Sequence, residues 1–221
     1  MTAATLRLAA LGVGAYLLGG IPFGVIVGRR WKGVDVRQFG SGNIGFANVL
    51  RTLGWGPALV VFVCDTGKGY LPVLAARYVT AGWAHAEPWV VLAGVLAVGG
   101  HVFSPWLRFR GGRAVLTSLG VLVGIAPWVA LAGLVVGATV ILTTRYVSVG
   151  SMAGVAAACA LAWLPGLGVS PVYAIFVTVA AVIIILRHLP NIRRLLAGRE
   201  LKAGRRPEEA AEPRGGTGGR R

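Results

Sequence analysis

The sequence predicts an all-α protein that crosses a membrane several times, and its composition is the first observation behind this prediction. Hydrophobic residues make up 56% of the 221 residues, charged residues make up only 13%, and the mean hydropathy is +0.73. A soluble domain usually has about a quarter of its residues charged, and disorder over most of the chain would require low hydrophobicity. Both cysteines, Cys64 and Cys159, lie in apolar runs, so a secreted scaffold held by disulfides is also excluded.

The second observation is a series of apolar runs, each of which is expected to form membrane-embedded helix. The runs cover residues 8–27, 57–79, 88–103, 114–143, 151–164 and 171–186. The basic flank of the first run, Arg29 and Arg30, follows the run instead of preceding it, which favours an uncleaved helix over a signal peptide. The run 114–143 is interrupted at Pro127, so it predicts either one tilted helix or a hairpin of two short helices.

The third observation is the placement of positive charge between the runs. Segments 29–51 and 104–113 and the tail after Arg187 are basic, whereas residues 80–87 contain no Lys or Arg. Basic loops stay in the cytoplasm, so we expect these three segments inside and the N-terminus outside. One helix over 114–143 would put the basic tail outside, whereas two helices leave it inside. We therefore predict two helices there and seven crossings in total. Residues 114–126 would span roughly 20 Å as a helix, short of a hydrocarbon core of about 30 Å, so a re-entrant hairpin or local thinning would be needed.

The chain is expected to divide into a membrane domain, residues 1–201, and a basic cytoplasmic tail, residues 202–221. The tail is rich in Gly, Arg, Glu and Pro and has no apolar period, so we expect it to be disordered. Its arginines could contact anionic lipid, and nucleic acid is not an expected partner. The 34 glycines indicate close contacts between helices, with Gly12, Gly94 and Gly133 as packing residues.

The segment 33–54 is the first candidate for chemistry. Its turn around Gly40, Gly42 and Asn43 could direct several backbone N–H groups at a phosphate, with Arg37 and Arg51 supplying charge. An ordinary glycine-rich membrane loop is the alternative. The same turn matches the dinucleotide pattern G-x-G-x-x-G, but that interpretation requires a βαβ unit, and an apolar run follows instead.

Charged and glycine residues mark two further places. Asp65 and Lys68 lie three residues apart in the second apolar run, so they form either a structural ion pair or a ligand site, and both interpretations place them inside the bundle. His101 ends the third run, and Gly111, Gly112 and Arg113 open the next one, an arrangement suited to binding an anion. Arg108 and Arg110 are interpreted as topology signals.

The last apolar run ends in a polar segment, 187–200, that contains His188 and Asn191 with Pro190 between them. Because Pro190 bends the chain, the two side chains need not share one helix face. The sequence has no HExxH, paired CxxC or carboxylate cluster, so no metal site is expected. Nothing calls for a cofactor.

Three of these segments together resemble one family. GSGNIGFANVLRTLG, GHVFSPWLRFRGGR and RHLPNIRRLLAGRE are similar to the three signature regions of the bacterial acyl-phosphate:glycerol-3-phosphate acyltransferases, PlsY. VDVRQFGSGN, the D-x-x-K-G of residues 65–69 and TRYVSVGSM extend the resemblance, which covers about residues 17–202.

The resemblance implies a seven-helix enzyme of the bacterial inner membrane, with its site near the cytoplasmic face. Such an enzyme transfers a fatty acyl group from acyl-phosphate to the 1-hydroxyl of glycerol 3-phosphate, giving lysophosphatidic acid for phospholipid synthesis. Acyl-CoA and acyl carrier protein are not its donors, and no cofactor takes part. Membrane lipid and the phosphate acyltransferase that makes acyl-phosphate are the further partners that this chemistry suggests.

The resemblance also implies residue roles, which divide into three sets. The catalytic set is Ser41, Arg51, His101, His188 and Asn191. The phosphate-binding set is Arg37, Gly40, Gly42, Asn43, Asn48, Gly111, Gly112 and Arg113. The supporting set is Asp65, Lys68 and Ser148. The proton acceptor stays open between a side chain such as His101 and the phosphate of the substrate.

The chain departs from the family pattern at two places. It has Phe46-Ala47-Asn48 where the family usually has Ala-Thr-Asn, and Arg113-Ala114 where the family has Lys-Gly. Arg113 offers a planar fork in place of a point charge, and Ala114 does not easily adopt a positive φ. Two other classes remain as alternatives, a transporter for small anions and a non-catalytic membrane scaffold. A transporter would more naturally show internal repeats, and none is clear.

Overall fold

The computed structural model describes residues 2–203, and within this range the protein contains α-helices and short 3₁₀ turns but no β-strand. The α-helices are α1 (Ala3–Gly20), α2 (Phe23–Lys32), α3 (Phe46–Leu53), α4 (Trp55–Val79), α5 (Glu87–Val102), α6 (Val115–Ile125), α7 (Pro127–Thr144), α8 (Val147–Ala162), α9 (Pro171–Arg187) and α10 (Leu189–Leu196). The 3₁₀ turns are η1 (Val36–Gln38) and η2 (Pro105–Leu107). From residue 204 on, the predicted tail lies outside the described residues.

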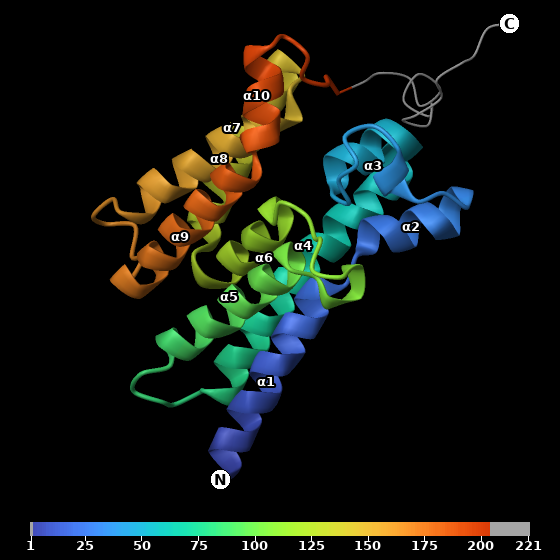
Figure 1. Cartoon of the computed structure of the whole chain (residues 1–221). Helices are drawn as coiled ribbons and strands as arrows, with labels where there is room; N and C mark the ends of the chain where they lie inside the picture. The colour runs from blue at the N-terminus through green and yellow to red at the C-terminus, as the bar shows by residue number, and fades with distance from the viewer. Residues whose placement is uncertain (1, 204–221) are drawn as a thin grey trace, which may run out of the picture.

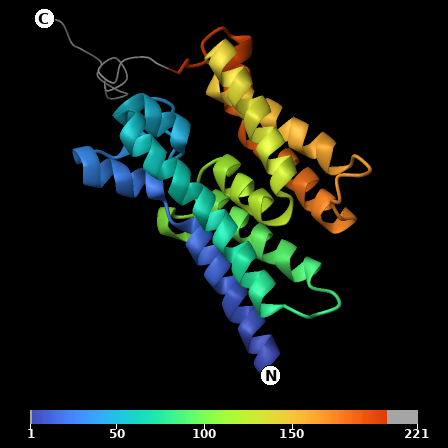
Figure 2. The same cartoon turned by 180° about the vertical axis from the view of Figure 1, so that it is seen from behind.

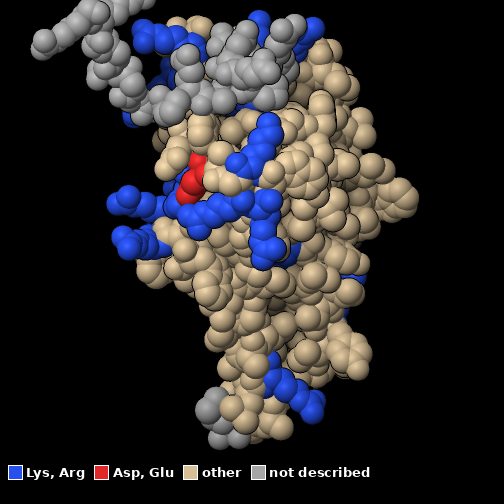
Figure 3. All heavy atoms as spheres, turned by 90° about the vertical axis from the view of Figure 1, so that its right-hand side faces the viewer, with Lys and Arg blue, Asp and Glu red and all other residues tan. Residues whose placement is uncertain are grey.

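The helices form two groups that lie side by side (Figures 1 and 2). α1 packs along α5 and α4, and α6 packs on α4, while α7 packs along α8 and α9 joins the second group through α8. α9 also contacts α5 and α6, which links the two groups. The short helices α2, α3 and α10 gather at one end of the molecule, opposite the N-terminus of α1. On the face that Figure 3 shows, most Lys and Arg side chains lie over this same end.

The predicted class, an all-α membrane protein, is confirmed. Among residues 2–203, four segments are long and apolar enough to cross a membrane: Ala3–Gly20, Trp55–Val79, Glu87–Leu107 and Pro127–Thr144. A fifth crossing results if α9 and α10, which are bent by 51° at their junction, count as one span. α6 and α8 are apolar but shorter. The seven crossings and the orientation of the termini therefore stay predictions.

Two breaks in the apolar runs concern proline. The run 114–143 divides as the hairpin alternative requires, because α6 ends at Ile125 and α7 begins at Pro127, a residue that is well tolerated in a first helical turn. The single helix predicted over 8–27 is wrong, since α1 ends at Gly20 and α2 begins at Phe23. Pro22 lacks an N–H and disfavours helical geometry at Ile21, which explains this second break.

Glycine allows the helices to approach closely, as predicted. A Cβ on Gly12, Gly94 or Gly133 would lie within 3.1 Å of a neighbouring helix. The tightest crossing joins α4 and α6, where a Cβ on Gly69 would overlap the carbonyl oxygen of Thr117. Membrane helices gain stability from such backbone approaches because dispersion contacts replace the hydrophobic driving force.

Gly69→Ala is expected to destabilise the protein by about 1–3 kcal/mol, the usual cost of overpacking a close contact. Gly67→Ala is the matched control, because Gly67 lies on the same helix with nothing within 4 Å of its Cβ position. Thermal unfolding in detergent measures both variants. Equal unfolding temperatures for the two would show that α4 and α6 do not cross as closely as described.

Candidate active site

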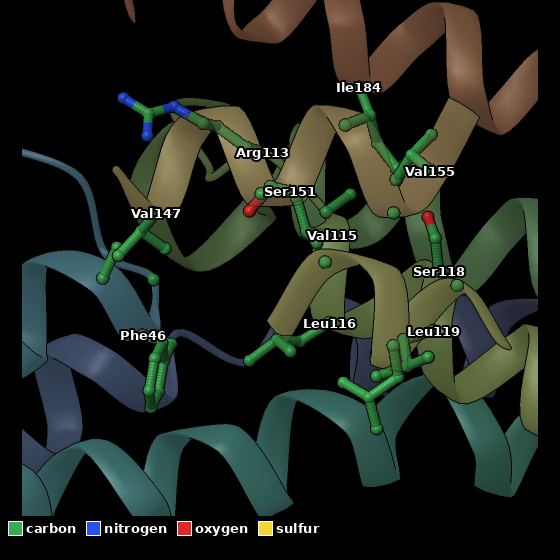
Figure 4. Close-up of a pocket in the computed structure, with 18 of the residues that line it drawn as sticks. Phe46, Arg113, Val115, Leu116, Ser118, Leu119, Val147, Ser151, Val155 and Ile184 are labelled. Atoms are coloured by element: carbon green, nitrogen blue, oxygen red, sulfur yellow. The ribbon is translucent and has the colours of Figure 1, made fainter. Parts of the chain in front are cut away.

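The polar ends of several helices surround the mouth of an apolar cavity of about 380 Å³, within the range of about 300–1,000 Å³ that ligand pockets occupy. α6, α7, α8 and α9 supply its apolar walls. Figure 4 shows Arg113, Phe46 and Val147 at one end and Ser118, Leu119 and Val155 further along. Many of the predicted site residues line this cavity: Asn43, Asn48, Arg51, Asp65, His101, Arg113, Ser148, His188 and Asn191.

A second, more polar pocket adjoins the cavity, and the two share Asn43. Ser41, Gly42, Gly111 and Arg37 line this outer pocket together with Arg110, which the sequence indicated only as a topology signal. Arg37 lies here and not with Arg51 and Arg113. Its Nη2 is 2.6 Å from Oδ2 of Asp35, and its Nε is 2.9 Å from Oδ1. The hydrogen bond from Arg37 lowers the pKa of Asp35 to about 2, so Arg37 already has an anionic partner.

The glycine-rich turn is held by Asn48, whose side chain is completely buried. Its Oδ1 accepts hydrogen bonds from the backbone N–H of Ser41 at 2.8 Å and from Oγ of Ser41 at 3.1 Å, and its Nδ2 donates to the carbonyl of Val36 at 2.7 Å. Gly40 has a φ of +53°, and a Cβ there would overlap Oδ1 of Asn48. Asn48 and Gly40 therefore set the position of Ser41.

Arg51 and Arg113 form a cationic group at the mouth of the cavity. Burial is the main reason that the pKa of Arg113 falls to about 10, and repulsion from Arg194 adds to it. Burial likewise lowers the pKa of Arg51. Nη2 of Arg51 donates to the carbonyl of Leu201 at 3.0 Å, while its buried Nε has no hydrogen-bond partner among the described residues. The charge of Arg51 also contributes to lowering the pKa of Arg113, and guanidinium groups that repel each other favour an anion between them.

The segment 198–203, named here the C-terminal strap, contacts this group through the carbonyl of Leu201. Glu200 is 8% exposed. Its Oε1 accepts hydrogen bonds from Ser148 at 2.7 Å and Asn191 at 2.6 Å, and its Oε2 accepts one from Arg194 at 2.7 Å. Burial alone would raise the pKa of Glu200, but these hydrogen bonds outweigh it and the pKa is lowered. No role for Glu200 could be predicted from the sequence, where its only signal is a lone carboxylate at the end of an arginine-rich motif.

His101 shapes the loop that leads to Arg113. Its ring lies against Gly112, and a Cβ on Gly111 would overlap the carbonyl oxygen of His101. From the other side, Nε of Arg187 donates to the carbonyl of Gly112 at 3.2 Å and Nη2 donates to that of Gly111 at 3.1 Å. A role for Arg187 could not be predicted, because nothing in the neighbouring sequence distinguishes it from a topology signal.

His188 lies at the junction between α9 and α10. Its Nδ1 is 2.8 Å from the carbonyl oxygen of Ile184. Because a carbonyl can only accept, Nδ1 carries the proton, and Nε2 of the neutral ring is left as an acceptor. His188 and Asn191 both line the cavity, although the bend between α9 and α10 prevents them from lying on one regular helix.

Asp65 and Lys68 face the bundle interior, as both interpretations of the sequence required. Nζ of Lys68 is 2.7 Å from Oδ1 of Asp65, and each residue is 2% exposed. Nζ also donates to the carbonyl of Ile21 at 2.7 Å, at the break between α1 and α2. Lys68 therefore supports that break, while Asp65 reaches the cavity wall. Within residues 2–203, no group of three or more His, Cys, Asp or Glu side chains could hold a metal ion.

Ala114 adopts the left-handed conformation that its position requires, with φ +62°. A non-glycine residue in this region costs of order 1 kcal/mol, so Ala114→Gly is expected to stabilise the protein by about 0.5–1 kcal/mol after the entropy of the unfolded chain is counted. Ala97→Gly, in the middle of α5, is the control and should destabilise it. Thermal unfolding in detergent tests both; a lower unfolding temperature for Ala114→Gly would contradict the strain.

The fold and the site define a helical integral-membrane protein with a cationic group at the mouth of an apolar cavity. The chain belongs to the glycerol-3-phosphate acyltransferase family, whose sequence profile matches residues 9–198. A glycerol-3-phosphate acyltransferase of Anaeromyxobacter sp. (strain K) is 47% identical over 85% of this chain and 92% of its own length. Another, from Thermus thermophilus, is 47% identical over 88% of this chain and 94% of its own length.

Solved structures agree with this assignment. The glycerol 3-phosphate form of PlsY, an integral membrane glycerol 3-phosphate acyltransferase, matches this fold with a TM-score of 0.81 and 36% identity, over 89% of this chain and 96% of that one. Its lysophosphatidic acid form matches with a TM-score of 0.78 and 35% identity, over 88% and 94% of the two chains.

Proposed function

We propose that this protein transfers a fatty acyl group from acyl-phosphate to the 1-hydroxyl of sn-glycerol 3-phosphate, producing lysophosphatidic acid and inorganic phosphate. The observation that carries the proposal is the position of buried Arg51 and half-buried Arg113 at the mouth of an apolar cavity. Cations suit the phosphates of both substrates, and the cavity suits an acyl chain. The solved relatives named for glycerol 3-phosphate and lysophosphatidic acid support the acceptor and the product.

In this reaction the hydroxyl oxygen attacks the acyl carbonyl, a new C–O ester bond forms, and the bond between the carbonyl carbon and the phosphate oxygen breaks. Phosphate leaves with the electron pair, and the hydroxyl proton ends on it. Arg51 and Arg113 stabilise the phosphate groups. Ser41, Asn191 and Nε2 of His188 hold the hydroxyl and the carbonyl by hydrogen bonds, so positioning supplies much of the catalysis because acyl-phosphate already has a good leaving group.

We place the site near the cytoplasmic face of a bacterial inner membrane. The basic residues Arg29, Arg30 and Lys32 end α2, at the same end of the molecule as α3 and α10. These two short helices carry the cavity residues Arg51 and Asn191. Basic segments stay on the cytoplasmic side, where phosphorylated metabolites are dissolved. Membrane lipid surrounds the apolar helices in this arrangement.

The donor is tested with purified protein in detergent, labelled glycerol 3-phosphate and three donors: palmitoyl-phosphate, palmitoyl-CoA and palmitoyl-acyl carrier protein. Lysophosphatidate and stoichiometric phosphate are expected from palmitoyl-phosphate alone. Product from either of the other donors at a similar rate would overturn the donor assignment. Uptake of glycerol 3-phosphate into proteoliposomes without any acylation would favour the transporter class instead.

A further inference from the structure

The apolar cavity runs lengthwise between four helices, with a polar and an apolar end. On α9 the lining extends from His188 to Phe176, and on α7 it extends from Leu142 to Ala130. Each of these stretches covers about 18 Å of helix. On α8 the lining reaches Ala158, and on α6 it reaches Leu122. The end with His188 carries the cations, while the far end consists of apolar side chains only.

The far end of the cavity is closed. Phe176 and Ala158 are buried there together with Ala130 and Leu122. The ring of Phe176 extends from α9 towards α5, where its Cε2 lies 3.6 Å from the Cβ position of Gly94. α7 and α8 touch at the same level, because the Cβ position of Gly133 is 3.1 Å from Cβ of Ala158.

The near end is open. Trp55, at the start of α4, and Leu142, near the end of α7, both line the cavity and are 71% and 80% exposed. An occupant could therefore enter at this exposed end and advance until it meets the closed end. The cavity is a blind tunnel whose opening adjoins the cationic group.

We propose that Phe176, Ala130 and Ala158 form a floor that limits the length of the acyl chain, so that the size of their side chains sets the chain-length preference. The inference rests on the proposed function, which places the acyl carbonyl at the cationic end. A carbon chain advances by roughly 1.3 Å per methylene, so the tunnel accommodates roughly 14 methylenes. Each methylene that loses its place in the tunnel is expected to lower kcat/KM about fourfold.

The test measures kcat/KM for a series of saturated acyl-phosphates from ten to twenty carbons, normalised within each variant. Ala158→Leu and Ala130→Leu raise the floor and are expected to move the preferred length down by about two or three carbons. Phe176→Ala lowers the floor and is expected to move it up by a similar amount. Normalisation within each variant removes the effect of partial unfolding, and Phe176→Leu is a milder second variant for the same direction.

Two controls lie on the same helices but outside the cavity lining. Ile175→Ala changes a neighbour of Phe176 that is exposed, and Ala160→Leu adds the same bulk to an exposed position of α8. Both should leave the length profile unchanged. The floor is overturned if the wild type is active but the length profile is the same in all four floor variants, or if the profile moves equally in the controls. Either result leaves the proposed function standing. If the wild type acylates glycerol 3-phosphate with none of these acyl-phosphates, whatever their length, both the floor and the proposed function are overturned.

Discussion

Arg51→Ala is expected to lower kcat/KM for glycerol 3-phosphate by about 10²–10³-fold, the usual cost of removing one group that stabilises charge in a transition state. Arg51 is buried at the cavity mouth, with one nitrogen holding Leu201 and another without a partner among the described residues. Because Arg113 and Arg194 remain nearby, some attraction for phosphate persists and activity should not vanish. Initial rates across substrate concentrations give the measurement.

Lysine substitutions separate charge from geometry at the two cations. Arg51→Lys keeps the charge but removes the fork that reaches both Leu201 and the cavity, so we expect most of the loss seen with alanine. Arg113→Lys restores the residue usual in the family and should stay within about tenfold of wild type. Near-normal rates for Arg51→Ala would show that the phosphate lies elsewhere, with the outer pocket around Ser41 as the next place to examine.

The helical membrane architecture could be predicted from the sequence because long apolar runs and clustered cations are properties of single segments. The break after Gly20 was not predicted, because residues 8–27 form one apolar run and the single Pro22 does not change its apolar composition. The contact that stabilises the break is also distant in sequence, since Lys68 in the middle of α4 donates a hydrogen bond to the carbonyl of Ile21. Local pattern finds helices, but distant contacts decide where some of them end.

The residues to which we assign the chemistry were easier to predict from the sequence than the residues that position them. Arg51, Arg113, His188 and Asn191 stand in motifs and meet at one cavity. Arg187 acts through the backbone carbonyls of the loop 111–112, a contact between segments 75 residues apart that no local motif reveals. Arg37 shows a different gap, because the position of a cation beside a glycine-rich turn does not reveal that its guanidinium already pairs with Asp35.

The second large effect is expected at Glu200. Glu200→Ala removes the acceptor of three hydrogen bonds from Ser148, Asn191 and Arg194 and leaves their donors buried, which should destabilise the site by about 2 kcal/mol or more. Release of the C-terminal strap would also free Arg51 from Leu201 and misplace Asn191. We therefore expect faster limited proteolysis near residue 200 together with a fall in kcat. Arg199→Ala, on an exposed neighbour in the same strap, is the control and should change neither.

The dependence of stability on pH distinguishes the contribution of the charge of Glu200 from that of its shape. Glu200→Gln keeps one acceptor oxygen but directs an amide at Nε of Arg194, so it should lose part of the stability at neutral pH. The pKa of Glu200 is lowered in the folded protein, so its charge stabilises the strap above the ordinary range of a carboxyl group and stops doing so as pH falls through the lowered value. The difference in unfolding temperature between wild type and Glu200→Gln should therefore narrow on acidification. A constant difference would mean that Glu200 holds the strap by packing, and that its charge contributes nothing.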